Sequence, residues 1–429
     1  MTFDYEKLDL PNGIRLRAVK IPQSPTVTFA VLVGTGSRQE TPALSGLAHF
    51  IEHTVFKGTP SLPSSQQVSD AIESIGGVHN AFTSFEYTGY YAKASSGRLP
   101  QLTKVISDVF LNPLFPRKDL DIELGNVIEE INMYEDNPLQ KVIRDFLRFT
   151  FSGHALGQSV LGTRENLQRF SQSDLTGFIN KFYDPRRIIV IAAGDFGPQE
   201  FFSLTEGIFG SVSLSGQVQL NPYTVTQQLP AIHILNKKLD QAHLVLGFRS
   251  FGLDDPREET LEVLNEILGG PASLSSRLFH KIRDELGLAY YVGSDTQSYK
   301  ETGIWLARAG VRIDKTREAV AAILGEYKKL ATAKVLDQEL ARAKEHLKGK
   351  LSFELETSDG VMEYYGLTEL TEAGFKTPQE KIAKIEAVTA EEVQKLASEL
   401  VDKNKLTVAV LGPFDETVEK EKILGLIGQ

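Results

Sequence analysis

The chain has 429 residues, no cysteine and a formal net charge of −10 at pH 7. The lack of cysteine excludes disulfides and thiolate metal sites and is compatible with a reducing compartment, so we expect a cytoplasmic protein. The acidic balance argues against nucleic-acid binding, which needs a basic surface, and the longest apolar runs, such as residues 188–193, are too short to span a membrane.

Two domains of roughly 200 residues each are expected from the length, because the chain is too long for one core. No leader peptide is expected, because the first six residues have neither a basic start nor an apolar core. In chain order, the first predicted strand covers residues 27–32, and a predicted helix follows it.

That helix carries a metal-site pattern. His49, Glu52 and His53 stand at positions i, i+3 and i+4, which share one face of a helix. Two neutral imidazoles one turn apart can both bind Zn²⁺, while the carboxylate between them lies beside the metal. This is the inverted zincin pattern H-x-x-E-H, in which the glutamate acts as general base toward zinc-bound water. The composition gives about 0.02 accidental matches to such a pattern, so chance is a weak alternative.

A second helix is predicted over residues 120–131. Its apolar residues form one buried stripe at i, i+4, i+7, i+8 and i+11, namely Leu120, Leu124, Val127, Ile128 and Ile131. Glu123 and Glu130 fall together on one flank of the stripe, and Glu129 falls on the opposite, solvated side. One of the two flank carboxylates can be the third ligand that zinc catalysis needs, and the other can orient a ligand or hold a substrate group. On periodicity alone, a solvated flank is the simpler interpretation.

The run from His49 to Thr59 (HFIEHTVFKGT) closely resembles the active-site helix of the pitrilysin/insulinase family of zinc peptidases. In that family the third ligand lies 77 positions after the second histidine, which here is Glu130, and a further glutamate lies seven residues earlier, which here is Glu123. Residues 80–84 and 90–93 resemble the family's edge strand, and residues 283–290 resemble its Arg/Tyr element. The length is similar to that of the short branch that includes the mitochondrial processing peptidases.

The resemblance implies a zinc endopeptidase mechanism. The implied roles are Zn²⁺ binding by His49, His53 and Glu130, general base catalysis by Glu52, support of the ligands by Glu123, binding of the substrate main chain at Asn80 and Ala81, binding of a substrate carbonyl by Arg283, and stabilisation of the oxyanion by Tyr290. A His₂Glu set also accepts Mn²⁺ or Co²⁺, so these ions stay open as alternatives to zinc.

An internal repeat divides the chain. Residues 27–32, 121–124 and 187–190 have counterparts at 242–247, 337–340 and 405–408. Each half is predicted as a strand, a helix, a strand pair, long helices and a final strand. The fold class is therefore α+β, with two homologous domains that each hold a mostly antiparallel sheet with helices packed on it; the family implies a clamshell-type arrangement. We predict a zinc-binding domain over 1–212, a linker over 213–229, and a second domain over 230–429 that lacks metal.

The repeat also tests the metal site. An offset of 216 places Asn265, Leu268, Gly269 and His346 at the positions of His49, Glu52, His53 and Glu130. The second half has therefore lost the donor set, and we expect one Zn²⁺ per chain, with His346 as a surface residue of a helix.

Arg283 and Tyr290 lie in the half without metal. In long family members the Arg/Tyr element of the last domain faces the zinc of the first domain. For a two-domain chain this implies a homodimer with composite active sites, which encloses a chamber for unfolded peptides. Two alternatives stay open: a non-catalytic core or presequence-binding subunit of the same fold, and one half of a heterodimeric peptidase.

Overall fold

The computed structural model describes residues 3–213, 216–217, 222–271, 273–371 and 374–427. Contacts divide the chain into two compact units, each built from three segments. Unit 1 comprises Met1–Asn132, Gln158–Asn221 and Ser352–Thr377, and unit 2 comprises Met133–Gly157, Pro222–Leu351 and Pro378–Gln429. Within the described ranges, no helix combines the length and the apolar character that a membrane span requires.

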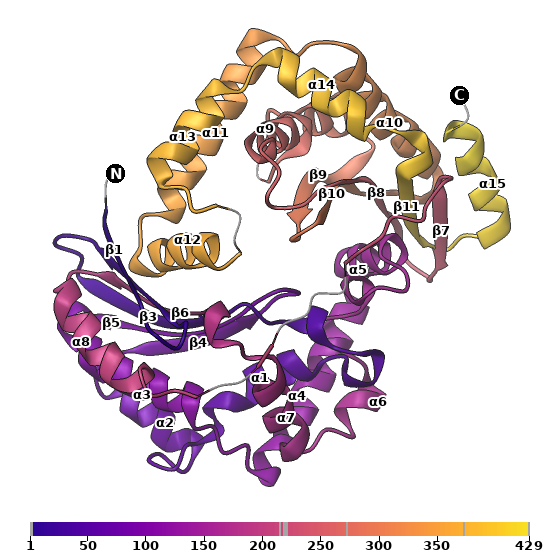
Figure 1. Ribbon diagram of the computed structural model, residues 1–429. Coiled ribbons are helices and arrows are strands. Elements are labelled where there is room, and N and C mark those ends of the chain that lie inside the picture. Colours follow the sequence, from indigo (N-terminus) through magenta and orange to yellow (C-terminus); the bar gives the residue numbers. More distant parts are fainter. Residues whose placement is uncertain (1–2, 214–215, 218–221, 272, 372–373, 428–429) are drawn as a thin grey trace. The chain divides into compact units, whose positions relative to one another are not determined.

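Unit 1 is built on a six-stranded sheet in the order β1-β2-β6-β3-β5-β4 (Figure 1). Its strands are β1 (Asp4–Asp9), β2 (Arg15–Lys20), β3 (Thr26–Val33), β4 (Val78–Thr83), β5 (Thr88–Ser95) and β6 (Ile188–Gly194). Only β2 and β6 run parallel; every other pair of neighbours is antiparallel. The central strands β3 and β6 are almost continuously buried, as expected for strands that are covered on both faces.

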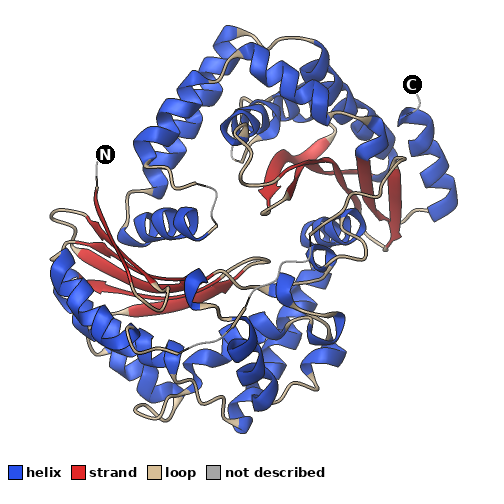
Figure 2. Ribbon diagram, viewed as in Figure 1, coloured by secondary structure: helices blue, strands red, loops and turns tan. Residues whose placement is uncertain are grey.

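Helices cover both faces of this sheet (Figures 1 and 2). The helices of unit 1 are α1 (Leu47–Thr54), α2 (Ser65–Glu73), α3 (Leu99–Leu111), most of α4 (Arg117–Asp136), α6 (Arg164–Leu167), α7 (Gln172–Phe182), α8 (Pro198–Phe209) and α12 (Ser358–Leu370). Helices α3 and α8 lie on one face, and α12 packs on β3 and β6 from the other. At Gly366 of α12 an added Cβ would lie 2.3 Å from a side-chain carbon of Leu32, so glycine permits the close approach of helix and sheet.

Ion pairs connect α12 to strands β1 and β2 of the sheet. A carboxylate oxygen of Glu369 lies 2.9 Å from the guanidinium of Arg17, which is 3% exposed, and the other lies 3.0 Å from the ammonium of Lys7. The hydroxyl of Tyr5 donates to Glu369 as well. A helix from late in the chain therefore completes the first sheet.

Unit 2 repeats the topology with one strand fewer. Its strands are β7 (Ala231–Asn236), β8 (Gln241–Phe251), β9 (Ala289–Ser298), β10 (Thr302–Arg312) and β11 (Leu406–Gly412), in the order β7-β11-β8-β10-β9. The one parallel pair, β7 and β11, corresponds to β2 and β6. The repeat and the α+β class predicted from the sequence are confirmed, because 27–32 and 242–247 lie on matching strands β3 and β8.

The helices of unit 2 include an exchanged element too. They are α5 (Pro138–Thr150), α9 (Glu258–Gly269), the π-helix η7 (Phe279–Glu285), α10 (Thr316–Thr332), α11 (Asp337–Glu354), α13 (Pro378–Ala387), α14 (Ala390–Leu400) and α15 (Glu416–Ile427). The last residues of α11 belong to unit 1, and the last residues of α4 belong to unit 2. Helix α5 comes from the first half of the sequence and packs on β11 and β8.

Two stretches of the predicted linker, 214–215 and 218–221, lie outside the described residues. Residues 222–229, after them, form no helix or strand and are held by unit 2. There the hydroxyl of Tyr223 donates to the carbonyl of Thr150 at 3.0 Å, and Arg249 donates to the side chain of Gln227.

Candidate metal centre

Helix α1 separates an apolar face from a polar one. Leu47, Phe50, Ile51 and Thr54 stand at i, i+3, i+4 and i+7, and all four are buried. The hydroxyl of Thr54 donates to the carbonyl of Phe50 at 2.6 Å and so stays satisfied. This leaves the complementary face to His49, Glu52 and His53, as the spacing predicts.

Helix α4 (Arg117–Asp136) brings the acidic residues. The predicted stripe is confirmed at Leu120, Val127 and Ile131, which are buried, and Glu129 is exposed. Glu123 is buried and Glu130 is half-buried. The two carboxylates therefore stand at the edge of the buried face.

Three donor atoms meet between α1 and α4. Oε2 of Glu130 lies 3.5 Å from Nε2 of His49 and 3.4 Å from Nε2 of His53. This oxygen is buried, and among the described residues it has no hydrogen-bond partner. In a tetrahedral zinc site with bonds of about 2.0–2.1 Å, neighbouring ligand atoms lie about 3.4 Å apart. The donor set therefore fits a zinc ion in both its chemistry and its spacing.

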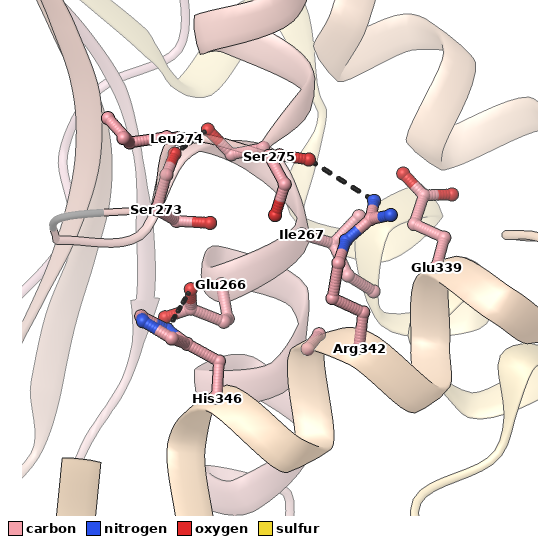
Figure 3. Close-up of a pocket in the computed structure, with 10 residues that line it drawn as sticks. Glu266, Ile267, Ser273, Leu274, Ser275, Glu339, Arg342 and His346 are labelled. Atoms are coloured by element: carbon pink, nitrogen blue, oxygen red, sulfur yellow. Dashed lines mark hydrogen bonds and ion pairs between the residues drawn. The ribbon is translucent and has the colours of Figure 1, made fainter. Parts of the chain in front are cut away.

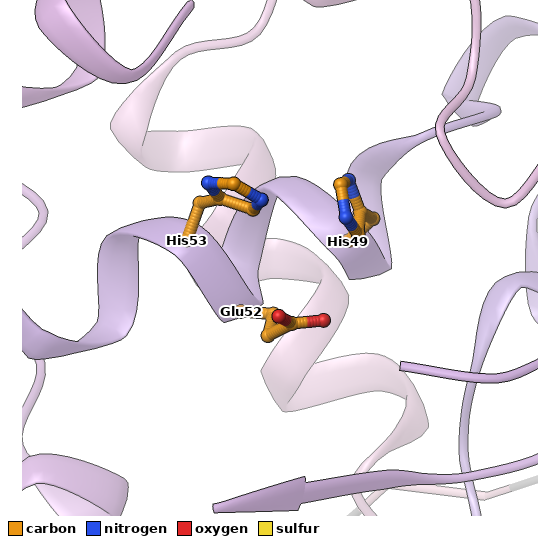
Figure 4. Close-up of side chains that lie close together, drawn as sticks. All are labelled: His49, Glu52 and His53. Atoms are coloured by element: carbon orange, nitrogen blue, oxygen red, sulfur yellow. The ribbon is translucent and has the colours of Figure 1, made fainter. Parts of the chain in front are cut away.

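Glu52 lies beside these donors. One donor atom from each of His49, Glu52 and His53 lies within 4.8 Å of the others, and Glu52 sits between the two imidazoles along α1 (Figure 4). Burial raises the pKa of the Glu52 carboxyl, and the neighbouring Thr83 hydroxyl on β4 and the His53 imidazole partly counteract it. A carboxyl with a raised pKa can both take up and release a proton near neutral pH.

Glu123 contacts His53 at Nδ1, the ring nitrogen that does not face Glu130. Its Oε2 lies 3.4 Å from Nδ1 of His53 and accepts a hydrogen bond of 3.1 Å from the amide of Asn126, while its Oε1 lies 2.7 Å from Nζ of Lys57. Burial alone would raise the pKa of Glu123, but the hydrogen bonds from His53, Lys57 and Asn126 lower it to about 2. The carboxylate is therefore ionised and can orient the imidazole.

The two histidines shift in opposite directions in the metal-free chain. Burial, together with the neighbouring His53, lowers the pKa of His49 to about 4. Burial also opposes the charge on His53, but the nearby carboxylates of Glu123 and Glu130 outweigh it and raise the pKa of His53 to about 9. The nearby imidazole of His53 lowers the pKa of Glu130. A negative oxygen therefore faces one charged and one neutral imidazole.

The predicted substrate residues Asn80 and Ala81 lie on β4, which is the edge strand of the sheet and packs against α1. The side-chain oxygen of Asn80 accepts the N–H of Ala81 at 2.9 Å. An edge strand has one row of main-chain groups without a strand partner, so β4 has the geometry for strand addition.

Arg283 and Tyr290 belong to unit 2, so the unit that holds the metal donors does not contain them. Arg283 lies on the exposed side of η7, with its guanidinium 4.8 Å from the ring centre of Phe279. Tyr290 stands at the start of β9 and is 78% exposed. Both side chains are accessible on unit 2, as residues that contact a substrate must be.

The position in unit 2 that corresponds to the metal centre is a cavity of about 280 Å³ between α9 and α11 (Figure 3). Glu266 and His346 face each other there, with Nδ1 of His346 2.7 Å from the carboxylate. The side chain of His346 is 43% exposed, as expected for a helix surface residue. Among the described residues, a cluster of three possible metal ligands occurs on α1 and not in this cavity.

Sequence reasoning missed two residues that support the centre. Lys57 lies within the run that resembles the family helix, but its contact with Glu123 depends on the packing of α1 against α4. Glu40 accepts hydrogen bonds from the backbone at the start of α1. A lone acidic residue in a loop gives no periodic signal, so nothing in the sequence indicates this role.

Known peptidase families and relatives match most of this chain. Residues 16–164 match the family Insulinase (Peptidase family M16), and residues 169–347 match the family Peptidase M16 inactive domain. The uncharacterised zinc protease YmxG of Bacillus subtilis is 35% identical over 94% of this chain and 97% of its own length. An uncharacterised zinc protease of Streptomyces coelicolor is 32% identical over 95% of this chain and 89% of its own length.

Solved structures share the fold. A protease from Helicobacter pylori has a TM-score of 0.88 at 22% identity, covering 96% of this chain and 100% of its own. A Pseudomonas fluorescens structure described as a peptidase M16 inactive domain has the same TM-score at 15% identity, covering 96% of this chain and 99% of its own.

Proposed function

The chain belongs to the insulinase family of peptidases, family M16, and we propose that it is a zinc-dependent endopeptidase that hydrolyses unfolded peptides. Two relatives that match 94% and 95% of this chain are named uncharacterised zinc proteases. The observation that carries the proposal is the approach of the His49 and His53 imidazoles to one buried carboxylate oxygen of Glu130, with Glu52 beside them.

His49, His53 and Glu130 would hold one Zn²⁺ per chain. Zinc in such a site supplies Lewis-acid chemistry, because it polarises a carbonyl and lowers the pKa of water to about 7. Glu52 takes the proton of the attacking water and delivers it to the leaving amine, a double role that suits a carboxyl whose pKa is raised by burial. Glu123 keeps His53 in the orientation that presents Nε2.

Substrate binding follows from the edge strand. A peptide added to β4 would lie next to α1 and bond through its main chain, so extended peptides of many sequences fit and folded segments do not. Asn80 and Ala81 contribute to this strand. We propose further that the chain forms a homodimer in which Arg283 binds a substrate carbonyl and Tyr290 stabilises the oxyanion in the partner's active site, and that it works in the cytoplasm.

Hydrolysis of a quenched-fluorescent, unstructured peptide tests the proposal. The arms are the zinc-loaded wild type, the same protein with a chelator, and Glu52→Gln; the matched control is Glu129→Gln, which changes an exposed carboxylate on α4. We expect cleavage by the wild type and the control, and none in the chelator and Glu52→Gln arms. A zinc-loaded wild type that binds a varied panel of peptides and cleaves none would contradict the proposal and favour a binding subunit. Activity that appears only with a second, different chain would favour a heterodimeric peptidase.

A further inference from the structure

Helix α1 begins without a capping side chain of its own. Its N-cap is Gly46, with φ 98°, and its first turn contains no acidic residue. The first backbone N–H groups of any helix lack partners within the helix, and here they are buried. A helix of eight residues is also too short to be stable by itself in water. The start of the metal-bearing helix therefore depends on groups from elsewhere.

Glu40 supplies the hydrogen-bond acceptors for the start of α1. Its Oε2 accepts the N–H of Gly46 at 2.8 Å, and its Oε1 accepts the N–H of Ala48 at 2.7 Å. The residue is 5% exposed, and no lysine, arginine or histidine in the described part of the chain pairs with it. Burial raises the pKa of Glu40 to about 8, and the hydrogen bonds from the backbone of residues 46–48 partly counteract it. The partners of this buried carboxyl group are therefore the N–H groups at the positive end of the helix dipole.

A glycine contact fixes the same end of the helix. A Cβ on Gly46 would lie 2.7 Å from Cα of Gly162, which itself has φ +75°. The Glu40 hydrogen bonds and the close approach of Gly162 therefore both constrain the backbone at residues 46–48. His49 is the next residue along the chain, and its Nε2 must meet Oε2 of Glu130.

The corresponding helix of unit 2 begins differently. Helix α9 has twelve residues and carries Glu258 and Glu259 in its own first turn. At the position of His49 it has Asn265. The helix without the metal donors thus starts with its own acidic residues, and the helix with them takes a carboxylate from six residues before its N-cap.

We propose that Glu40 is a positioning residue for the metal centre: its buried carboxylate fixes the N-terminal end of α1 and thereby sets His49 against His53 and Glu130. The proposal rests on the proposed function, because it requires that these three residues bind zinc. Glu40 acts through the backbone and touches neither substrate nor metal.

Zinc affinity of the full-length chain tests this, measured by competition with a chromophoric chelator and independently of peptide cleavage. Glu40→Gln keeps the shape but turns an amide N–H₂ toward backbone N–H groups. We expect zinc affinity to fall about 10- to 100-fold, as when other supporting partners of metal ligands are lost. At saturating zinc we expect kcat to fall while KM stays unchanged. The control Glu326→Gln changes a buried carboxylate on α10 of unit 2 and should bind zinc as the wild type does.

The outcomes separate the two proposals. A Glu40→Gln protein that melts earlier but binds zinc within about twofold of the wild type would reduce Glu40 to a stabilising role and overturn this inference. If Glu40→Gln does not fold, Glu40→Asp, which keeps the carboxyl group on a shorter side chain, should still show weakened zinc binding, and unchanged affinity there would also overturn it. A wild type that binds no zinc would overturn the proposed function along with this inference.

Discussion

Lys57 and Glu123 form an ion pair of 2.7 Å directly behind the metal donors, and the same carboxylate faces Nδ1 of His53 at 3.4 Å. Lys57 contacts Glu123 and is not one of the proposed zinc ligands. It lies on the 3₁₀ turn that follows α1. Glu123 of α4 is therefore contacted by His53 of α1 and by Lys57 of the turn after it.

Removal of that lysine should weaken the centre without abolishing it. In Lys57→Met, Glu123 loses its nearest partner and is freer to turn away from His53, so we expect zinc affinity to fall by about tenfold. Lys57→Arg should lose less, because it keeps the charge. Competition with a chromophoric chelator measures both. Lys118→Met, which changes an exposed lysine on α4, is the control, and an equal loss in that variant would contradict the role of Lys57.

Replacement of the acidic donor should have a larger effect. Glu130→Gln keeps the size of the side chain but offers a neutral amide where a charged oxygen faces two imidazoles. We expect zinc affinity to fall at least about 100-fold, with a melting temperature of the metal-free protein close to that of the wild type. Calorimetric titration with zinc gives the affinity. Glu129→Gln serves as the neighbouring control, and retention of wild-type affinity by Glu130→Gln would exclude it as a ligand.

The metal-free chain should show a pH-dependent contribution from His53. Because the folded-state pKa is raised to about 9, the protonated imidazole stabilises the fold fully below its unfolded value of about 6.5, and this stabilisation is lost as the pH rises through the folded value. The difference in free energy of unfolding between wild type and His53→Ala should therefore shrink between about pH 6 and about pH 9.5. Urea unfolding in a chelator checks this. A difference that stays constant with pH would show that no proton is taken up on folding.

Gly46 should resist substitution. Gly46→Ala places a Cβ on a residue with φ 98°, 2.7 Å from Cα of Gly162, so we expect the free energy of unfolding to fall by at least about 1–2 kcal/mol. Gly97→Ala is the matched control, because a Cβ there meets nothing within 4 Å. Equal stability of both variants in urea would mean that the start of α1 adjusts without cost.

Local patterns and spacing were enough to predict the elements that carry the chemistry. The 3.6-residue period places Glu123 and Glu130 at the edge of the stripe on α4, and the i, i+3, i+4 spacing places His49, Glu52 and His53 on one face of α1. The offset between the halves predicts two homologous domains, and the structure shows that their sheets have corresponding strand orders. Each of these features depends on neighbours along one element or on a repeat.

Supports that come from distant segments were not predictable in this way. Glu40 reaches α1 through an irregular loop, and Lys57 meets Glu123 across 66 positions of sequence, so neither contact leaves a periodic trace. The placement of α12 depends on Glu369 meeting Arg17, 352 positions away. Such contacts are decided by which surfaces pack together, and no single element encodes that choice.

The exchange of α5 and α12 between the homologous halves bears on how the chain is made. During synthesis, all six strands of the first sheet emerge from the ribosome before α12 does, and the face of β3 and β6 that α12 covers stays bare until Leu370 has been added. Helix α5 is likewise synthesised before β8 and β11, the strands on which it packs. Each half of the sequence therefore contains a helix that covers the sheet of the other half. A cell that produced either half by itself would make a sheet with an uncovered apolar face.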